Sequence, residues 1–239
     1  MKKKIVLFAI LSIVILAILL GTNFIKIGYM STIKYHGFKE VRDNIFIDNN
    51  YLDEDEEILS MIDTANERNE DFFGELEGMT VIIVTDDEEK LNKLGNPSST
   101  AFTTTYVFKG AHNYTVVSGE KAELHILAHE LSHAEIHSRL YKNKWSSKDS
   151  IPIWFDEGLA MQNDYRDKYS ESEFEKISDA RDITDISDEA FFDSNKEIRV
   201  ENYILAKHMV STLIKDKGKE QIFNLIDRVN NGEKFNIDY

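Results

Sequence analysis

Four of the seven histidines recur at intervals of four residues between positions 125 and 137, and this spacing constrains the local fold more than any other feature of the chain. Residues four apart lie one turn above one another on an α-helix, so the pattern predicts a helix with a row of imidazoles along one side. His129 and His133 can then direct two ring nitrogens at one ion. Glu130 lies about 100° further round the helix, where it can move a proton but cannot easily be a ligand. The four histidines are His125, His129, His133 and His137.

The segment from 129 to 133 reads His-Glu-Leu-Ser-His and matches H-E-x-x-H, in which two histidines hold zinc and the glutamate is the general base. A solvated helix face can match this pattern by coincidence, so the third protein ligand of a catalytic zinc decides between the two readings. A histidine at 139 after a glycine at 136 would supply that ligand, but these positions hold Arg139 and Ile136. Glu157 is the remaining candidate, because its carboxylate stands among apolar neighbours, where an unpaired charge is costly. The alternative for Glu157 is a carboxylate that caps a helix or forms an ion pair.

Together, "HELSH" and "PIWFDEGLA" (residues 152–160) make the chain resemble the gluzincin metallopeptidases, in particular the small peptidase domains related to the aminopeptidase-N superfamily. The resemblance covers roughly residues 100–230. It implies a zincin-like fold with one Zn²⁺ per chain, held by His129, His133 and Glu157, and Glu130 as catalytic base.

The same resemblance implies a tyrosine that donates a hydrogen bond to the oxyanion. Tyr203 in "NYILAKHMVSTLI" is the candidate, and His208 is the competing donor. Two departures from the family are evident. "GAHN" (110–113) lacks the glutamate that binds a free amino terminus in the aminopeptidases, so that specificity is not implied. Position 161 is methionine where thermolysin-like enzymes have a supporting aspartate, so Asp156 or Asp164 must orient the ligands.

The chain opens with three lysines and an apolar run from Ile5 to Leu20, interrupted only by Ser12. With the following residues the run is about long enough for one bilayer crossing, and the lysines favour a cytoplasmic amino terminus. We therefore expect residues 1–28 to be a transmembrane anchor, or else a cleaved signal segment. Residues 29–239 are then one extracytoplasmic peptidase domain.

Hydrophobic periodicity predicts an α+β domain, with a small mixed sheet followed by the histidine helix and a mostly helical carboxyl-terminal half. Gly158 should let two helices approach closely. Ser118 is the expected cap of the histidine helix. Helices are expected from about 53 to 73, 119 to 141, 152 to 165, 171 to 179, 186 to 192, 199 to 216 and 219 to 230, and strands at 79–86, 99–108 and 112–119.

The net charge of −15 disfavours nucleic acid as a partner, because an acidic domain repels phosphate. The absence of cysteine excludes thiolate ligands and a cysteine nucleophile. The function expected from these features is zinc-dependent hydrolysis of peptide bonds at the outer face of a membrane. Two alternatives stay open: an inactive, membrane-anchored binding or sensory module, and hydrolysis of a non-peptide bond such as an acyl ester.

Overall fold

The structure, a computed structural model, describes residues 25–51, 55–95, 100–147, 150–178 and 186–237. Within these ranges no helix is both long and apolar enough to cross a membrane. The apolar run expected to do so falls on residues 1–24, outside the described residues.

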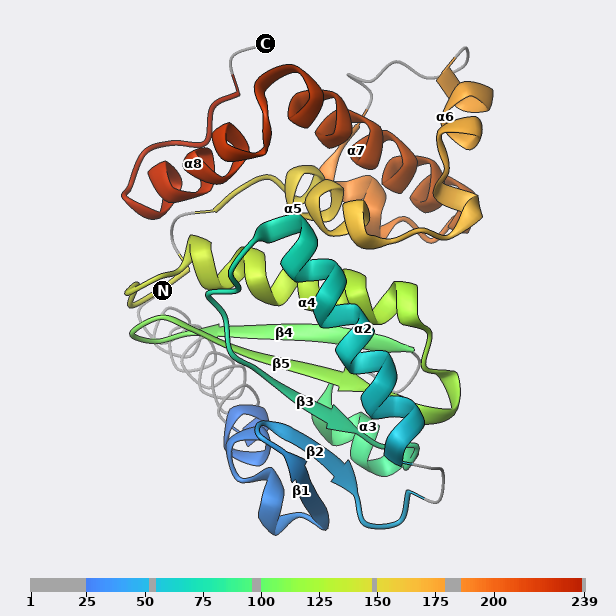
Figure 1. The fold of residues 1–239 in the computed structure, drawn as a ribbon, viewed down its shortest axis with the longest axis vertical. Helices are drawn as coiled ribbons and strands as arrows, with labels where there is room; N and C mark the ends of the chain where they lie inside the picture. Colours follow the sequence, from blue (N-terminus) through green and yellow to red (C-terminus); the bar gives the residue numbers. More distant parts are fainter. Residues whose placement is uncertain (1–24, 52–54, 96–99, 148–149, 179–185, 238–239) are drawn as a thin grey trace, which may run out of the picture.

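A mixed five-stranded sheet in the order β1-β2-β3-β5-β4 forms one half of the molecule (Figure 1). β2, β3 and β5 are parallel to one another, whereas β1 and β4 pair antiparallel at the two edges. Valine and isoleucine fill β3, and its last three residues are buried, as expected for a strand covered on both faces. The strands are β1 (Phe38–Arg42), β2 (Ile45–Asp48), β3 (Thr80–Val84), β4 (Ala101–Val107) and β5 (Ala111–Val117).

Helices cover both faces of the sheet. α2 (Asp55–Phe73) and α4 (Leu124–Leu140) lie on one face, where residues such as Ile62, Val84 and Leu131 form a shared core. Residues from 25 to 35 and α3 (Glu88–Leu94) cover the other face, with Met30, Ile83 and Leu91 buried between them.

The other half of the molecule is helical and packs against α4 (Figure 1). Gly158 confirms the expected close approach, because a Cβ there would lie 2.5 Å from the backbone oxygen of Ala206 on α7. Its elements are α5 (Ile153–Ala160), α6 (Glu171–Ser178), α7 (Lys196–Lys217) and α8 (Lys219–Asn230), with the 3₁₀ turns η3 (Met161–Asn163), η4 (Asp167–Tyr169) and η6 (Asp188–Phe192).

The α+β class is confirmed, and several local expectations are wrong. The β1–β2 hairpin was not expected; Asn44 turns it with a φ of 62°. Ser118 does not cap α4, because the turn η2 (Gly119–Lys121) intervenes and the Ser118 hydroxyl donates to Asp86. The expected helix at 186–192 is a 3₁₀ turn, and the helix predicted from 152 ends as α5 at Ala160.

Candidate metal centre

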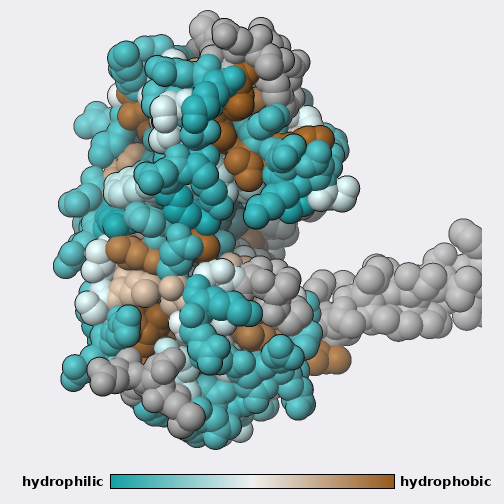
Figure 2. Space-filling model, turned by 90° about the vertical axis from the view of Figure 1, so that its right-hand side faces the viewer, coloured by the Kyte–Doolittle hydropathy of each residue, from teal (hydrophilic) through white to brown (hydrophobic). Residues whose placement is uncertain are grey.

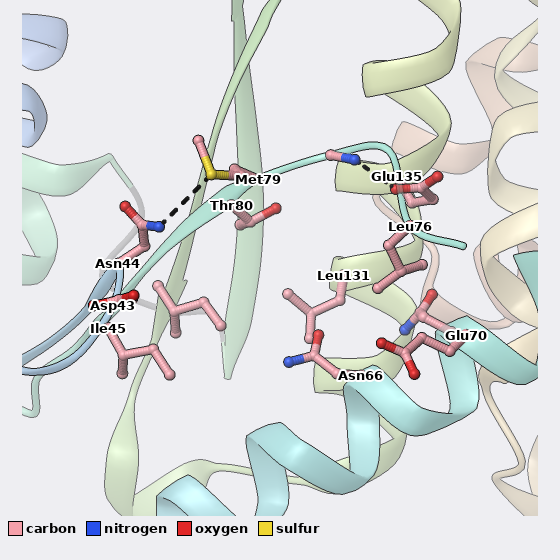
Figure 3. Close-up of a pocket in the computed structure, with 13 residues that line it drawn as sticks. Asp43, Asn44, Ile45, Asn66, Glu70, Leu76, Met79, Thr80, Leu131 and Glu135 are labelled. Carbon is pink, nitrogen blue, oxygen red and sulfur yellow. Dashed lines mark hydrogen bonds between the residues drawn. The ribbon is translucent and has the colours of Figure 1, made fainter. Parts of the chain in front are cut away.

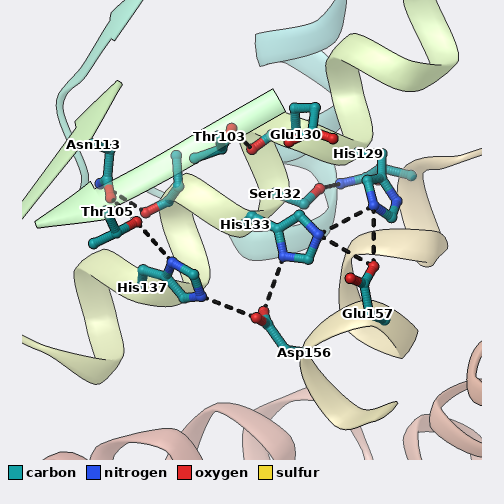
Figure 4. Close-up of polar contacts among 12 residues, drawn as sticks. Thr103, Thr105, Asn113, His129, Glu130, Ser132, His133, His137, Asp156 and Glu157 are labelled. Carbon is teal, nitrogen blue, oxygen red and sulfur yellow. Dashed lines mark hydrogen bonds and ion pairs between the residues drawn. The ribbon is translucent and has the colours of Figure 1, made fainter. Parts of the chain in front are cut away.

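α4 and α5 bring three potential metal ligands together. α4 buries one side against the sheet and α2, through residues such as Leu127 and Leu131, and this leaves the histidines facing α5. α5 begins directly after Pro152, whose fixed φ suits a helix start. It buries Phe155 and Leu159 in the helical half and turns the carboxylate of Glu157 back toward α4 (Figure 4).

The donor atoms of His129, His133 and Glu157 stand at distances that suit one ion. The two imidazole Nε2 atoms are 3.1 Å apart, and each lies 3.3 Å from Oε2 of Glu157. In a tetrahedral site with bonds of 2.0–2.1 Å, neighbouring ligand atoms are about 3.3 Å apart. The structure thus brings together all three residues predicted as ligands, in a group able to hold a metal ion.

Unsatisfied polar atoms in the same cluster also fit a cation. Two Nε2 atoms that face each other cannot both direct a proton along the same line, so at least one presents a lone pair. Oε2 of Glu157 is buried and has no hydrogen bond of acceptable geometry, despite its two imidazole neighbours. Buried polar atoms without partners are rare in folded proteins. A metal ion would satisfy these atoms together.

The charges of the clustered histidines and carboxylates shift one another's pKa values. Burial alone would raise the pKa of Glu157, but the neighbouring His133 and His129 outweigh it and hold that pKa at about 2. Burial raises the pKa of Glu130, opposed by the same two histidines. Glu130 is therefore a better proton acceptor than an ordinary surface carboxylate, as a general base requires.

Asp156, one of the two candidates for orienting a ligand, contacts the predicted ligand His133. Its Oδ1 lies 3.1 Å from Nδ1 of His133, and its Oδ2 lies 2.9 Å from Nε2 of His137 (Figure 4). The other nitrogen of His137 lies 2.7 Å from the hydroxyl of Thr105 on β4. A carboxylate on the far nitrogen of a ligand histidine fixes its ring and tautomer.

Asp164, His125 and His137 are outside the predicted ligand set, and each has other partners. Asp164 is buried and holds the Arg166 guanidinium, so it does not orient a ligand. His125 lies 2.9 Å from Arg68. The ring of His137 is held between Asp156 and Thr105.

Tyr203 borders the cluster and His208 does not. The Tyr203 ring centroid is 6.4 Å from that of His129. Burial, followed by the charge of Glu157, raises the pKa of Tyr203, so its hydroxyl keeps its proton and can donate it to an acceptor. His208 instead stacks on Phe174 and pairs with Glu171.

A buried polar network, absent from the sequence predictions, joins the elements behind the site. The Ser132 hydroxyl and the Asn163 amide both donate to the side-chain oxygen of Asn69 on α2. The Asn69 amide donates in turn to the backbone of Ala128. These bonds tie α2, α4 and η3 together. Their only signal in the sequence is the polar Ser132 between the two histidines that are predicted as ligands.

A separate pocket lies on the far side of α4 (Figure 3). Leu131 and Glu135 line it, and each of these residues is about 160° round the helix from His133. Glu135 accepts from the backbone nitrogens of Glu77 and Gly78 and from Arg139, so this buried carboxylate is fully partnered. The pocket shares no residue with the metal-ligand group.

Comparison of the chain with models of protein families, with curated proteins and with solved structures yields no match.

Proposed function

We propose that the chain is a zinc-dependent metallopeptidase with a zincin-like fold. It rests on the convergence of His129, His133 and Glu157 at near-tetrahedral spacing, where the buried Oε2 of Glu157 has no hydrogen bond. Two imidazoles and one carboxylate on two helices leave one position open, as catalytic zinc sites do, whereas structural sites are closed by four protein ligands.

Glu130 is the base in this proposal. A bound zinc would act as a Lewis acid and lower the pKa of water to about 7. Glu130, one residue after the first ligand, accepts the proton of the attacking water and passes it to the amine that leaves when the C–N bond breaks. Tyr203 keeps its proton and donates a hydrogen bond to the oxyanion, a contact worth about 3 to 4 kcal/mol.

β4 is the proposed platform for the peptide. It is an edge strand, and among the described residues no backbone–backbone hydrogen bond is made to its outer side between Ala101 and Val107. The Thr103 hydroxyl donates to the backbone oxygen of Glu130, so this edge lies beside the residue that we propose as the base. An extended peptide can pair with such an edge through its backbone, so that recognition does not depend on one side chain.

From the apolar amino-terminal run we further propose that this reaction takes place at the outer face of a membrane. The test uses the full chain purified in detergent, loaded with zinc and offered a mixed peptide library and a panel of acyl esters. Peptide cleavage that is lost in Glu130→Gln supports the proposal. Ester cleavage alone would replace it with a different hydrolase, and zinc binding without any hydrolysis would favour a binding module.

A further inference from the structure

Three cationic side chains lie beyond the amino-terminal end of α4, and we call Arg68, Arg166 and Lys168 the basic shoulder. Nη1 of Arg68 lies 2.9 Å from Nδ1 of His125, and its guanidinium stacks over the ring of Tyr165 at 4.7 Å. Among the described residues, Arg68 makes no ion pair with a carboxylate.

Arg166 and Lys168 flank a buried ring that leads to the metal centre. Their charged groups lie 5.0 Å and 4.8 Å from the ring centroid of Tyr169. That ring is 6.0 Å from Tyr203, which is itself 6.4 Å from His129. Two aromatic rings, those of Tyr169 and Tyr203, thus lie between the two cations and His129.

The shoulder is locally basic although the chain carries a net charge of −15. Arg166 is held by Asp164, and Glu123 at the start of α4 is the other acid whose charge acts on Lys168. Among the described residues Lys168 makes no ion pair. Burial lowers the pKa of Lys168, and the positive charge of Arg166 adds to this effect. A carboxylate placed here would relieve that repulsion.

The direction of β4 decides which side of the substrate meets the shoulder. Thr103 contacts Glu130 and Thr105 contacts His137, so β4 and α4 run the same way. A peptide that pairs antiparallel with β4, the slightly more stable arrangement, has its carboxyl-terminal side toward the start of α4. Figure 2 looks onto this side of the molecule, and its surface is mainly hydrophilic.

We propose that the basic shoulder binds a carboxylate of the substrate on the carboxyl-terminal side of the scissile bond. This inference rests on the proposed peptidase function. The carboxylate is either an acidic side chain or the free carboxyl terminus of a short peptide, since both present the same two oxygens to a cationic side chain.

Binding is measured with the zinc-loaded, full-length Glu130→Gln variant, which retains all three proposed ligands. The probes are fluorescent peptides of one sequence, derived from a peptide that the wild-type chain cleaves or, failing cleavage, from a neutral peptide that the variant binds. They differ by Asp or Asn at the two positions after the scissile bond, or by a free or amidated carboxyl terminus. We expect a carboxylate form to bind about tenfold more tightly than its amide. Adding Arg68→Gln and Lys168→Gln should abolish this preference, whereas Lys142→Gln, an exposed lysine at the other end of α4, should leave it intact.

The two members of each pair separate the sources of the carboxylate. A preference confined to the Asp/Asn pair identifies a side chain, and one confined to the free/amidated pair identifies the terminus. Equal binding within both pairs, or a preference that survives the double substitution, overturns the inference even if the wild-type chain cleaves peptides. Preferential binding without cleavage by the wild-type chain overturns the peptidase proposal and leaves the carboxylate site standing.

Discussion

α4 carries buried charged groups on two sides, and the two differ in how completely their polar atoms are partnered. On the side facing α2 and β3, Glu135 receives two backbone N–H groups and Arg139, and Arg139 donates further to the backbone oxygens of Phe73 and Glu75. On the side facing α5, two imidazole nitrogens point at each other and a buried carboxylate oxygen has no hydrogen bond.

The difference between these two sides of α4 distinguishes a structural role, on the side of Glu135, from a functional role, on the side facing α5. A buried charged group whose partners are all present stabilises the folded arrangement of those partners. Removing one partner leaves a buried charge unpaired and destabilises the fold. Donor atoms that converge without partners are arranged for something that enters the site. Burial and charge alone do not distinguish the two sides; the unsatisfied atoms do.

The largest expected effect is on the chemistry of the α5-facing side. Glu130→Gln should lower kcat for peptide cleavage by about 10²- to 10⁴-fold, because the amide cannot accept the proton. Zinc content and thermal midpoint should stay close to those of the wild-type chain. Steady-state kinetics, elemental analysis and circular dichroism measure the three quantities. A Glu130→Gln variant that retains full activity would show that the base lies elsewhere.

Glu135→Ala tests the stability of the side of α4 that faces α2 and β3. Removing this carboxylate leaves Arg139 buried without its main partner, so we expect a loss of about 3 to 5 kcal/mol in the free energy of unfolding. Urea titration followed by tryptophan fluorescence measures this loss. Zinc bound per folded chain should not change. Loss of zinc from folded Glu135→Ala would mean that the two sides of the helix are not separate in function.

A smaller effect is expected for Asp156, which supports the site without joining the proposed ligand set. Asp156→Asn should weaken zinc affinity by about 10- to 100-fold, since the ring of His133 loses its carboxylate partner. Competition with a chromophoric chelator measures the affinity. Asp227→Asn, at an exposed position of α8, is the matched control and should bind zinc as the wild-type chain does. An unchanged zinc affinity in Asp156→Asn would show that the contact between Asp156 and His133 does not support zinc binding.

The smallest effect is expected at Asp48, a second fully partnered buried carboxylate. Burial alone would raise the pKa of Asp48, but Lys90, Thr85 and the backbone of Asn50 outweigh it and lower that pKa. The ionised form therefore stabilises the fold above the unfolded pKa of about 3.9, and this contribution is lost as the pH falls through the lower folded value. Urea titrations from pH 6 to pH 2 should show a smaller acid-induced loss in Asp48→Asn than in the wild-type chain. Parallel pH profiles would contradict this assignment.

The sequence predicts the local parts of the site better than the distant ones. His129, Glu130 and His133 lie within five residues of one helix, so their spacing alone predicts their geometry. Glu157 could be predicted because a carboxylate in an apolar segment needs a partner. The contact from His137 to Thr105 depends on how β4 packs beside α4, and no local pattern records it.

For the fold, too, local elements can be predicted from the sequence better than elements that depend on distant contacts. β3 is a valine- and isoleucine-rich run and β5 ends in Thr-Val-Val, so both are predicted as strands. α8 starts where Gly218 breaks the preceding helix. The β1–β2 hairpin escaped prediction because "KEVRDNIFID" mixes charges with only a few apolar residues. The hairpin joins the sheet because β2 pairs with β3, and these two strands are more than thirty residues apart in the sequence.

The central claim is that the donors between α4 and α5 bind one zinc ion. Elemental analysis of the full chain, purified after exposure to zinc and dialysis, tests it beside Glu157→Ala and Glu130→Gln. We expect about one zinc per chain in the wild type and in Glu130→Gln, and loss of that zinc in Glu157→Ala. A folded wild-type chain that takes up no zinc even from excess would rule out the metal centre and leave "HELSH" as a helix face that fits the pattern by chance.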